Sequence, residues 1–348
     1  MKIHKFKFTI LIFGSILLTS CSELLYTSVD VLRPAKFAFT PSARNLLIVN
    51  NSVTQPSEYG HRTELINQKT KNILIETDSL PIFAVSSLGE DIEAKGFFST
   101  VRIIPISQNK SKIFGSITPL DSESVNNLCA EYHTDAVISL DRLKVNDDLS
   151  EYFSDQNNSF LAVLEARFET FWSIHYPNNT EFSQIQFKDT VFWESESYNR
   201  KKAMQDLPNR ADALVDGALN AGQKTVNRFI PYWEKEDRYL YNSRNKYLKR
   251  GMDSVYVKNW KSAIEIWKTG LNKSNNTLTK SQAANNIAVG YEIIGDIDKA
   301  LDYANQAYYN LGKSYLADYS SLVRISDYIE DLTKRKAEIA KLKTQLGE

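Results

Sequence analysis

Paired carboxylates are the residues that come nearest to a catalytic pattern in this chain. Asp147 stands beside Asp148, and Glu194 lies two residues before Glu196. A glycosidase needs two acids about 5 to 9 Å apart whose pKa values differ. A chain with 42 acidic residues offers such pairs by chance, so we interpret both pairs as parts of solvated loops. No catalytic residue is predicted from them.

Cysteine and histidine raise the possibility of nucleophilic or metal chemistry. Cys129 lies in a helical pattern, where we interpret it as a small buried hydrophobe. The alternative is a nucleophile with His133 as its base, since a helix would bring residues four apart together. His61, His133 and His175 are far apart in the chain, and no H-x-x-x-H or C-x-x-C pattern accompanies them. We therefore predict no metal site.

The segment Gly217–Thr225 imitates a phosphate-binding loop only in part. Gln223 stands between the glycine and the lysine, and the segment is expected in the middle of a helix rather than between a strand and a helix. The chain contains no G-x-S-x-G nucleophile elbow. These patterns predict no enzyme activity and no cofactor, and a hydrolase is the least favoured alternative.

The beginning of the chain resembles the signal of a bacterial lipoprotein. Three lysines precede Phe8–Leu18, an apolar run that is too short to cross a bilayer core of about 30 Å. The run ends in Leu18-Thr19-Ser20-Cys21, which resembles a lipobox. That resemblance implies cleavage of residues 1–20, a diacylglycerol on Cys21 and acyl chains as the membrane anchor. An ordinary secretory signal or a membrane helix is the alternative.

Composition favours an ordinary folded protein of two domains. The chain has 348 residues, of which 42% are hydrophobic and 24% charged, and its 42 basic residues balance its 42 acidic ones. Loss of residues 1–20 would remove three lysines and no acid. The mature chain therefore has no basic excess of the kind that binds nucleic acid.

Strands and helices alternate in the first half of the mature chain. Short apolar runs predict strands at residues 43–50, 98–104 and 136–140, and a spacing of three and four predicts a helix at 80–95. Asp121 is positioned to cap a further helix. Alternation of this kind is typical of βαβ units with parallel pairing.

The middle of the chain changes character. Residues 160–176 and 180–193 predict an antiparallel hairpin, and a helix is expected over 210–229. Trp172 and Trp193 lie on the two hairpin strands, where packing within the sheet is favoured over stacking on a sugar.

The last third of the chain contains an internal period. Aligning Ala263 with Ala300 brings two copies into register, with turns at Asn259-Trp260 and Gly295-Asp296. Small residues where two helices cross, and large residues between them, resemble the tetratricopeptide repeat. The positions that form these repeats are Tyr247, Gly251, Trp260, Ala263, Trp267, Ala284, Tyr291, Ala300, Ala304 and Ala307. A plain pair of helical hairpins is the alternative, and a helix over 318–346 is expected to cap the array.

Together these patterns predict an α+β protein in three segments. Residues 1–20 form a lipoprotein signal peptide, 21–231 a mixed α/β domain with a β-hairpin, and 232–348 an all-α tetratricopeptide-like domain. The order of these parts, with the phrases Val29–Ala35 and Leu47–Ser52, resembles an uncharacterised family of Bacteroidota lipoproteins.

The functional expectation follows from the anchor and the repeats. We expect a non-enzymatic lipoprotein of the outer membrane, in the periplasm or at the cell surface, that holds a protein partner through its helices. Ser22, rather than an aspartate, after Cys21 favours the outer membrane by resemblance. A glycan-binding accessory lipoprotein is the alternative, and neither nucleic acid nor a cofactor is expected as a partner.

Overall fold

The computed structural model describes residues 23–111 and 113–348, which form two compact units. The α/β unit comprises Leu32–Tyr232 with Lys341–Glu348, and the helical unit comprises the described residues up to Val31 with Trp233–Ala340. The predicted α+β class is confirmed. The units differ from the predicted contiguous segments, because the first strand in the described residues, β1 (Glu23–Arg33), pairs with β9 (Tyr232–Asn242).

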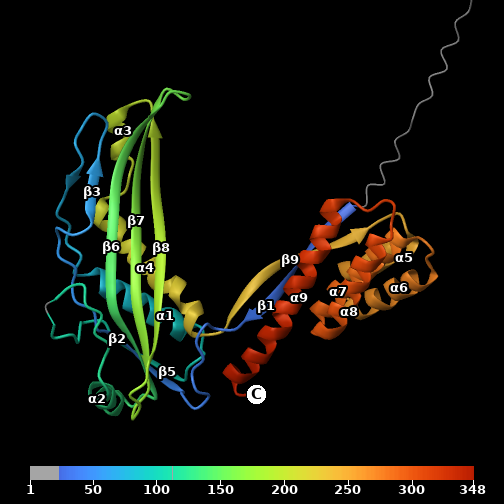
Figure 1. Ribbon diagram of the computed structural model, residues 1–348, viewed down its shortest axis with the longest axis horizontal. Helices are drawn as coiled ribbons and strands as arrows, with labels where there is room; N and C mark the ends of the chain where they lie inside the picture. Colours follow the sequence, from blue (N-terminus) through green and yellow to red (C-terminus); the bar gives the residue numbers. More distant parts are fainter. Residues whose placement is uncertain (1–22, 112) are drawn as a thin grey trace, which may run out of the picture. The chain divides into compact units, whose positions relative to one another are not determined.

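Seven strands form the sheet of the α/β unit, in the order β4-β3-β6-β2-β5, with β7 beside β6 and β8 beside β7 (Figure 1). The strands are β2 (Asn45–Asn50), β3 (His61–Glu64), β4 (Lys71–Asn72), β5 (Thr100–Ile104), β6 (Ala136–Ser154), β7 (Ser159–His175) and β8 (Ser183–Ser197). The helices are α1 (Leu80–Ala94), α2 (Ser122–Tyr132), α3 (Arg200–Gln205) and α4 (Arg210–Phe229).

The predicted elements of this unit are confirmed. β2 pairs in parallel with β5 and with β6, and β7 and β8 form the antiparallel hairpin. The side chain of Asp121 accepts a hydrogen bond from the backbone nitrogen of Ser124 and so caps α2. One strand is much longer than predicted. β6 continues beyond Leu140 to Ser154 and pairs with β7 along nearly its whole length.

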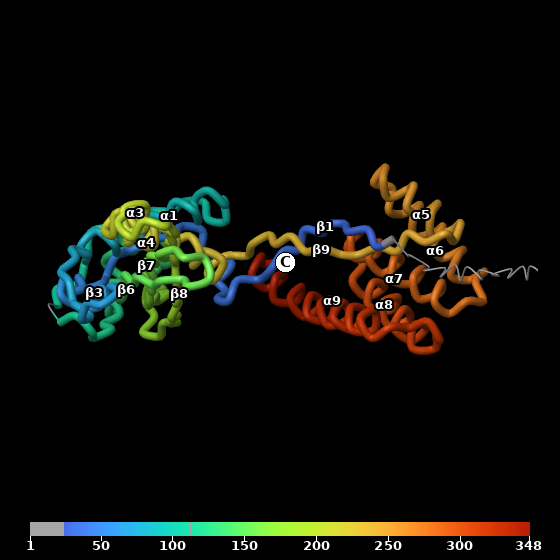
Figure 2. The backbone as a smooth tube through the Cα atoms, turned by 90° about the horizontal axis from the view of Figure 1, so that it is seen from above, coloured from blue at the N-terminus to red at the C-terminus, as the bar shows by residue number. Residues whose placement is uncertain are grey.

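Strand β2 is buried on both faces, which places a core on each side of the sheet. Leu46 and Ile48 belong to the larger core, which α1 and α4 complete. Leu47 and Val49 pack with Cys129 of α2 on the opposite face. Figure 2 shows α1, α3 and α4 together on one side of β6, β7 and β8.

In the helical unit, α5 packs against α6, α6 against α7, and α7 against α8 (Figure 2). The elements of this unit and its borders are β1 (Glu23–Arg33), β9 (Tyr232–Asn242), α5 (Lys246–Tyr256), α6 (Trp260–Lys273), α7 (Thr277–Ile293), α8 (Ile297–Gly312) and α9 (Tyr319–Leu346). The turns predicted at Asn259-Trp260 and Gly295-Asp296 are confirmed, and the side chains of Asn259 and Asp296 cap the helices α6 and α8 that follow them. No helix in the described ranges has both the length and the apolar character needed to cross a membrane.

Close packing in this unit depends on glycines, of which Gly251 makes the tightest approach. A Cβ atom on Gly251 would lie 2.0 Å from the indole nitrogen of Trp267, whose side chain is fully buried. Glycine therefore allows α5 to approach α6 at this point. The central helix α7 is also tied to β9, because the amide of Asn286 bonds both the nitrogen and the carbonyl oxygen of Tyr241.

Candidate functional site

The paired acids lie on strands, so the expectation of solvated loops is wrong. Asp147 and Asp148 belong to β6, while Glu194 and Glu196 belong to β8. Because side chains alternate along a strand, neighbouring acids point to opposite faces of the sheet. Asp147 is fully buried beneath the helices. Asp148 lies on the other face, where it pairs with two partly exposed arginines, and the salt bridges lower its pKa.

Asp147 joins three elements of the α/β unit. One carboxylate oxygen contacts Nδ1 of His61 on β3, and the other contacts Nε of Arg210, the first residue of α4. Arg210 also donates to the hydroxyl of Thr63 at 2.8 Å and to the carbonyl oxygen of Arg62 at 2.6 Å. Nε2 of His61 is buried without a hydrogen-bond partner. This cluster connects β3, β6 and α4 on the buried face of the sheet.

A second buried carboxylate, Asp141, lies at an irregularity in the sheet. The ladder between β6 and β7 shifts its register at this residue, as in a β-bulge. Asp141 accepts hydrogen bonds from the hydroxyls of Ser139, at 2.8 Å, and Ser173, and from the amide of Asn51, at 3.0 Å. Three donors therefore stabilise a carboxylate that is almost completely buried.

Ser139 and His175 complete a serine, histidine and aspartate cluster at this position. The hydroxyl oxygen of Ser139 lies 3.1 Å from Nε2 of His175, whose pKa is lowered by burial. In a hydrolase the serine donates its proton to the histidine and the acid orients the imidazole. Here the Ser139 hydroxyl donates to Asp141 instead, so that it can only accept from the imidazole. The cluster is therefore arranged as a structural network.

Cys129 occupies the interior position predicted for a small hydrophobe. Its side chain is buried in α2, and burial raises the pKa of the thiol. A raised pKa keeps the thiol protonated and a weak nucleophile. His133 ends α2 with a left-handed backbone, at φ 53°. In the described part of the chain, no three or more histidine, cysteine or acidic residues are arranged to hold a metal ion.

The hairpin tryptophans pack within the fold, as the sequence favoured. Trp172 is fully buried and lies edge-on to Phe229 of α4, while Trp193 is partly buried against the same core. The segment Gly217–Thr225, which resembles a phosphate-binding loop only in part, lies inside α4. A Cβ atom on Gly217 would lie 2.2 Å from the ring of Phe168. That glycine allows α4 to approach the sheet.

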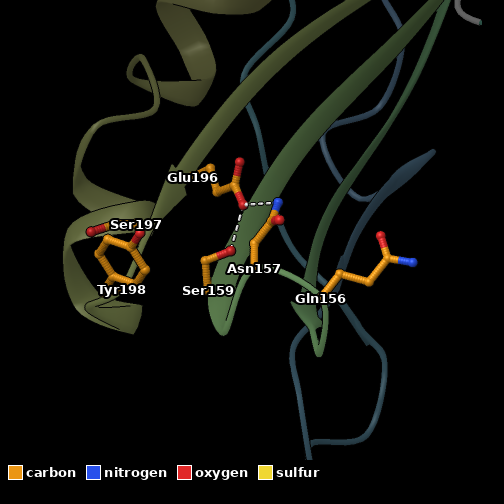
Figure 3. A pocket seen from close by; sticks show the side chains of 6 residues that line it. All are labelled: Gln156, Asn157, Ser159, Glu196, Ser197 and Tyr198. Carbon is orange, nitrogen blue, oxygen red and sulfur yellow. Dashed lines mark hydrogen bonds between the residues drawn. The ribbon is translucent and has the colours of Figure 1, made fainter.

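An open pocket lies where the turn between β6 and β7 meets the end of β8. It has a volume of about 610 Å³, and its lining residues are Gln156, Asn157, Ser159, Glu196, Ser197 and Tyr198 (Figure 3). Asn157 and Ser159 both donate to one carboxylate oxygen of Glu196, and these bonds lower the pKa of that carboxyl. The second oxygen is directed away from them, as Figure 3 shows. Tyr198 is 81% exposed.

The predicted repeat residues line the core of the helical unit. Most are buried where helices meet: Gly251, Ala263, Trp267, Ala284, Tyr291, Ala300, Ala304 and Ala307. Tyr247 and Trp260 are half-buried. Burial of these side chains is expected for any packed pair of helical hairpins. The assignment to tetratricopeptide repeats therefore stays a prediction. The predicted lipidation site, Cys21, lies outside the described residues.

The helical unit contains its own buried charged cluster. Glu292 on α7 pairs with Arg238 of β9 at 2.9 Å and with Arg335 of α9 at 2.6 Å. The hydroxyl of Tyr328 donates to the same carboxylate, also at 2.9 Å, and burial raises the pKa of that phenol. The cluster ties α7, β9 and α9 together, and its charges are paired with one another.

Six apolar side chains are exposed around the turn between α8 and α9. We name this group the α8–α9 apolar cluster, and its members are Tyr308, Tyr309, Tyr315, Leu316, Tyr319 and Val323. The internal period that located the core of this unit did not indicate this cluster, because three of its members lie in or next to the turn. The run of tyrosines between residues 308 and 319 was the available signal.

Two family models match the chain. The model described as Domain of unknown function (DUF8603) matches residues 43–241, and the one described as Domain of unknown function (DUF6340) matches residues 249–334. No curated protein sequence matches the chain.

Two solved structures show a distant likeness. The crystal structure of an uncharacterized protein is 7% identical and covers 54% of this chain and 94% of its own, with a TM-score of 0.23. A structure described as a neuraminyllactose-binding hemagglutinin homolog from Helicobacter pylori is 11% identical and covers 56% of this chain and 90% of its own, with a TM-score of 0.28. At these TM-scores neither likeness carries an argument about this chain.

Asp147→Asn is expected to lower the free energy of unfolding of the α/β unit by about 3 kcal/mol or more, because it leaves Arg210 and His61 buried without their acid. Asp148→Asn is the matched control, since its arginine partners are about half exposed, and it should cost less than about 1 kcal/mol. Urea unfolding followed by tryptophan fluorescence measures both. Equal losses for the two variants would contradict the assigned role of Asp147.

Proposed function

The chain belongs to the family described as Domain of unknown function (DUF8603), and because that description assigns no activity, we propose a function from the chain's own residues. The protein is a non-enzymatic lipoprotein of the bacterial outer membrane. It is anchored through lipid on Cys21 and serves as a protein-binding scaffold or assembly accessory of the cell envelope. Its partner is a protein that docks on the helical unit.

The α8–α9 apolar cluster is the observation that carries the proposal. Large exposed apolar groups are costly in water and commonly mark sites of protein association. Tyr315 and Tyr319 are both more than four-fifths exposed, the highest exposed fractions among the large apolar side chains that the structure describes. A tyrosine offers a broad apolar ring and a hydroxyl that stays hydrogen-bonded, which suits an interface that forms and dissociates.

Charge around the cluster supports a protein partner over a bare lipid surface. Lys313 lies 4.0 Å from the ring centre of Tyr309, and Asp318 in the same turn accepts hydrogen bonds from Ser320 and Ser321. These bonds lower the pKa of Asp318 to about 2, so that the acid stays ionised. Opposite charges within one apolar cluster favour a partner with a mixed polar and apolar surface.

The double variant Tyr315→Ser/Tyr319→Ser is expected to reduce partner capture by about tenfold or more, because buried tyrosines commonly dominate interface energies. Capture is measured by crosslinking in intact cells, purification of the chain and quantitative mass spectrometry. Tyr256→Ser is the control, since Tyr256 is also exposed but lies on α5, outside the cluster. Partners captured equally by the double variant would contradict docking at this cluster.

The anchor is tested separately. Cys21→Ser is expected to move the protein from the membrane fraction to the soluble fraction and to remove the diacylglycerol mass from its N-terminal peptide. Cys129→Ser is the matched control, because Cys129 is buried in α2 and should leave the membrane fraction unchanged. Wild-type protein with an unmodified Cys21 would exclude the lipoprotein assignment.

The hairpin pocket favours a second candidate function, the binding of a glycan. Sugar hydroxyls need several polar groups at fixed positions, and sugar ring faces pack on exposed aromatic rings. Glu196 offers an oriented carboxylate, Asn157 and Gln156 offer amides, and Tyr198 offers an exposed ring (Figure 3). On this alternative the protein is an accessory that holds a glycan at the hairpin end of the α/β unit.

Oligosaccharides that bind the wild type on a glycan array are expected to bind Tyr198→Ala and Glu196→Gln at least about tenfold more weakly, because each change removes a contact at the centre of the pocket. Calorimetry with the best oligosaccharide measures this loss. Tyr256→Ala, an exposed tyrosine on α5, should bind normally. A wild type that binds no oligosaccharide would exclude this second candidate.

A further inference from the structure

Strand β8 forms a long open edge of the sheet. It pairs with β7 over 15 residues, and the register between them is regular from end to end. Among the described strands, none pairs with the other side of β8 (Figure 1). In an antiparallel sheet, alternate residues of an edge strand direct their backbone N–H and C=O groups away from the neighbour. That side of β8 therefore presents a regular row of backbone donors and acceptors.

This edge lacks most of the devices that prevent strands from pairing with other chains. Natural edges are short, bulged, interrupted by proline or covered. β8 is long, contains no proline and includes the consecutive apolar residues Val191, Phe192 and Trp193. Phe192 is 56% exposed. Its one lysine, Lys188, lies 3.2 Å from Glu169 on β7, but its side chain is 69% exposed and stays accessible to a second acid.

The side chains of β8 are complementary to a second copy of the same strand. An antiparallel pair with its two-fold axis at Val191 places Lys188 opposite Glu194 of the other copy, and this pair occurs twice. It also places Thr190 opposite Phe192, on the same face, and leaves no like charges opposite each other. A parallel pair in register would instead place Lys188 opposite Lys188, which is unfavourable.

Glu194 is the residue that selects this register. Its neighbour on β7 is Val163, and no salt bridge to Glu194 is found among the described residues. Glu196, two residues further on, already accepts hydrogen bonds from Asn157 and Ser159. A lysine arriving from the open side therefore gives Glu194 an opposite charge that its own sheet does not supply.

We propose that β8 is the interface of a homodimer, in which the β8 strands of two copies pair antiparallel about a two-fold axis at Val191. The backbone ladder supplies the attraction, and the two Lys188–Glu194 pairs set the register. This interface lies on the α/β unit and is independent of the proposed docking site on the helical unit.

The proposal is tested by exchanging the two charges in the full lipidated chain. Sedimentation equilibrium measures the dimerisation constant in a density-matched detergent, with micelles in large excess over protein. The wild type is expected to dimerise in the micromolar range. Lys188→Glu and Glu194→Lys should each weaken the dimer by about tenfold or more, since each places like charges opposite each other twice. The double variant should restore the dimer. An equimolar mixture of the two single variants should restore it too, because opposite charges then face each other only in the heterodimer.

Lys69→Glu, an exposed lysine outside β8, is the charge control and should dimerise as the wild type does. Circular dichroism of each variant confirms that the monomer is folded. A wild type that stays monomeric at about 100 μM overturns the proposal. Single variants that dimerise normally, or a mixture that fails to restore the dimer, overturn the register.

A cysteine placed on the axis gives a second readout in intact cells. Val191→Cys brings two thiols to facing positions, where Cα atoms about 4.5 to 5.5 Å apart allow a disulfide. Gln186→Cys, on the same strand, would place its two thiols roughly 30 Å apart and should form none. A disulfide-linked dimer for Val191→Cys alone is expected on a non-reducing gel. Equal crosslinking of both variants, or of neither, contradicts the antiparallel pair.

Discussion

The backbone of β6 is the constraint on which the α/β unit depends. Its first residues pair in parallel with β2, its later residues pair in parallel with β3, and β7 runs antiparallel along its other side. One strand therefore joins the βαβ part of the unit to the hairpin. Three buried carboxylates lie on this strand: Asp141 at the shift in its register, and Asp147 and Glu151 further along.

In both units a buried carboxylate joins elements that are distant in the chain. Packing of apolar side chains is not directional, so it does not by itself determine the register of an element against its neighbours. Asp147 ties a helix start and two strands in the α/β unit, and Glu292 ties two helices and a strand in the helical unit. Their partners satisfy the buried charges, while the surfaces left for binding are exposed side chains and an open strand edge.

Sequence patterns located most elements because the causes of those elements are local. The apolar spacing of α4 gave its bounds, the predicted cap Asp121 marked the start of α2, and the turns predicted at Asn259-Trp260 and Gly295-Asp296 marked the starts of α6 and α8. The second half of β6 was missed because the adjacent acids Asp147 and Asp148 were interpreted as part of a solvated loop, although apolar and polar residues alternate there as in a half-buried strand. The hairpin pocket was missed as well, because its residues come from the turn between β6 and β7 and from the end of β8. Ser159 and Glu196, for example, are 37 residues apart in the chain.

The sequence by itself determined the fold class, the bounds of helices such as α4 and the core-facing residues of the helical unit, since each depends on neighbours within a few turns of chain. Only the tertiary structure decided which charges are buried. Asp147 and Asp148 are adjacent and chemically identical, yet one meets His61, 86 residues away, inside the fold, and the other lies on the outer face of the sheet. Contacts at that separation depend on strand order, which no local pattern contains.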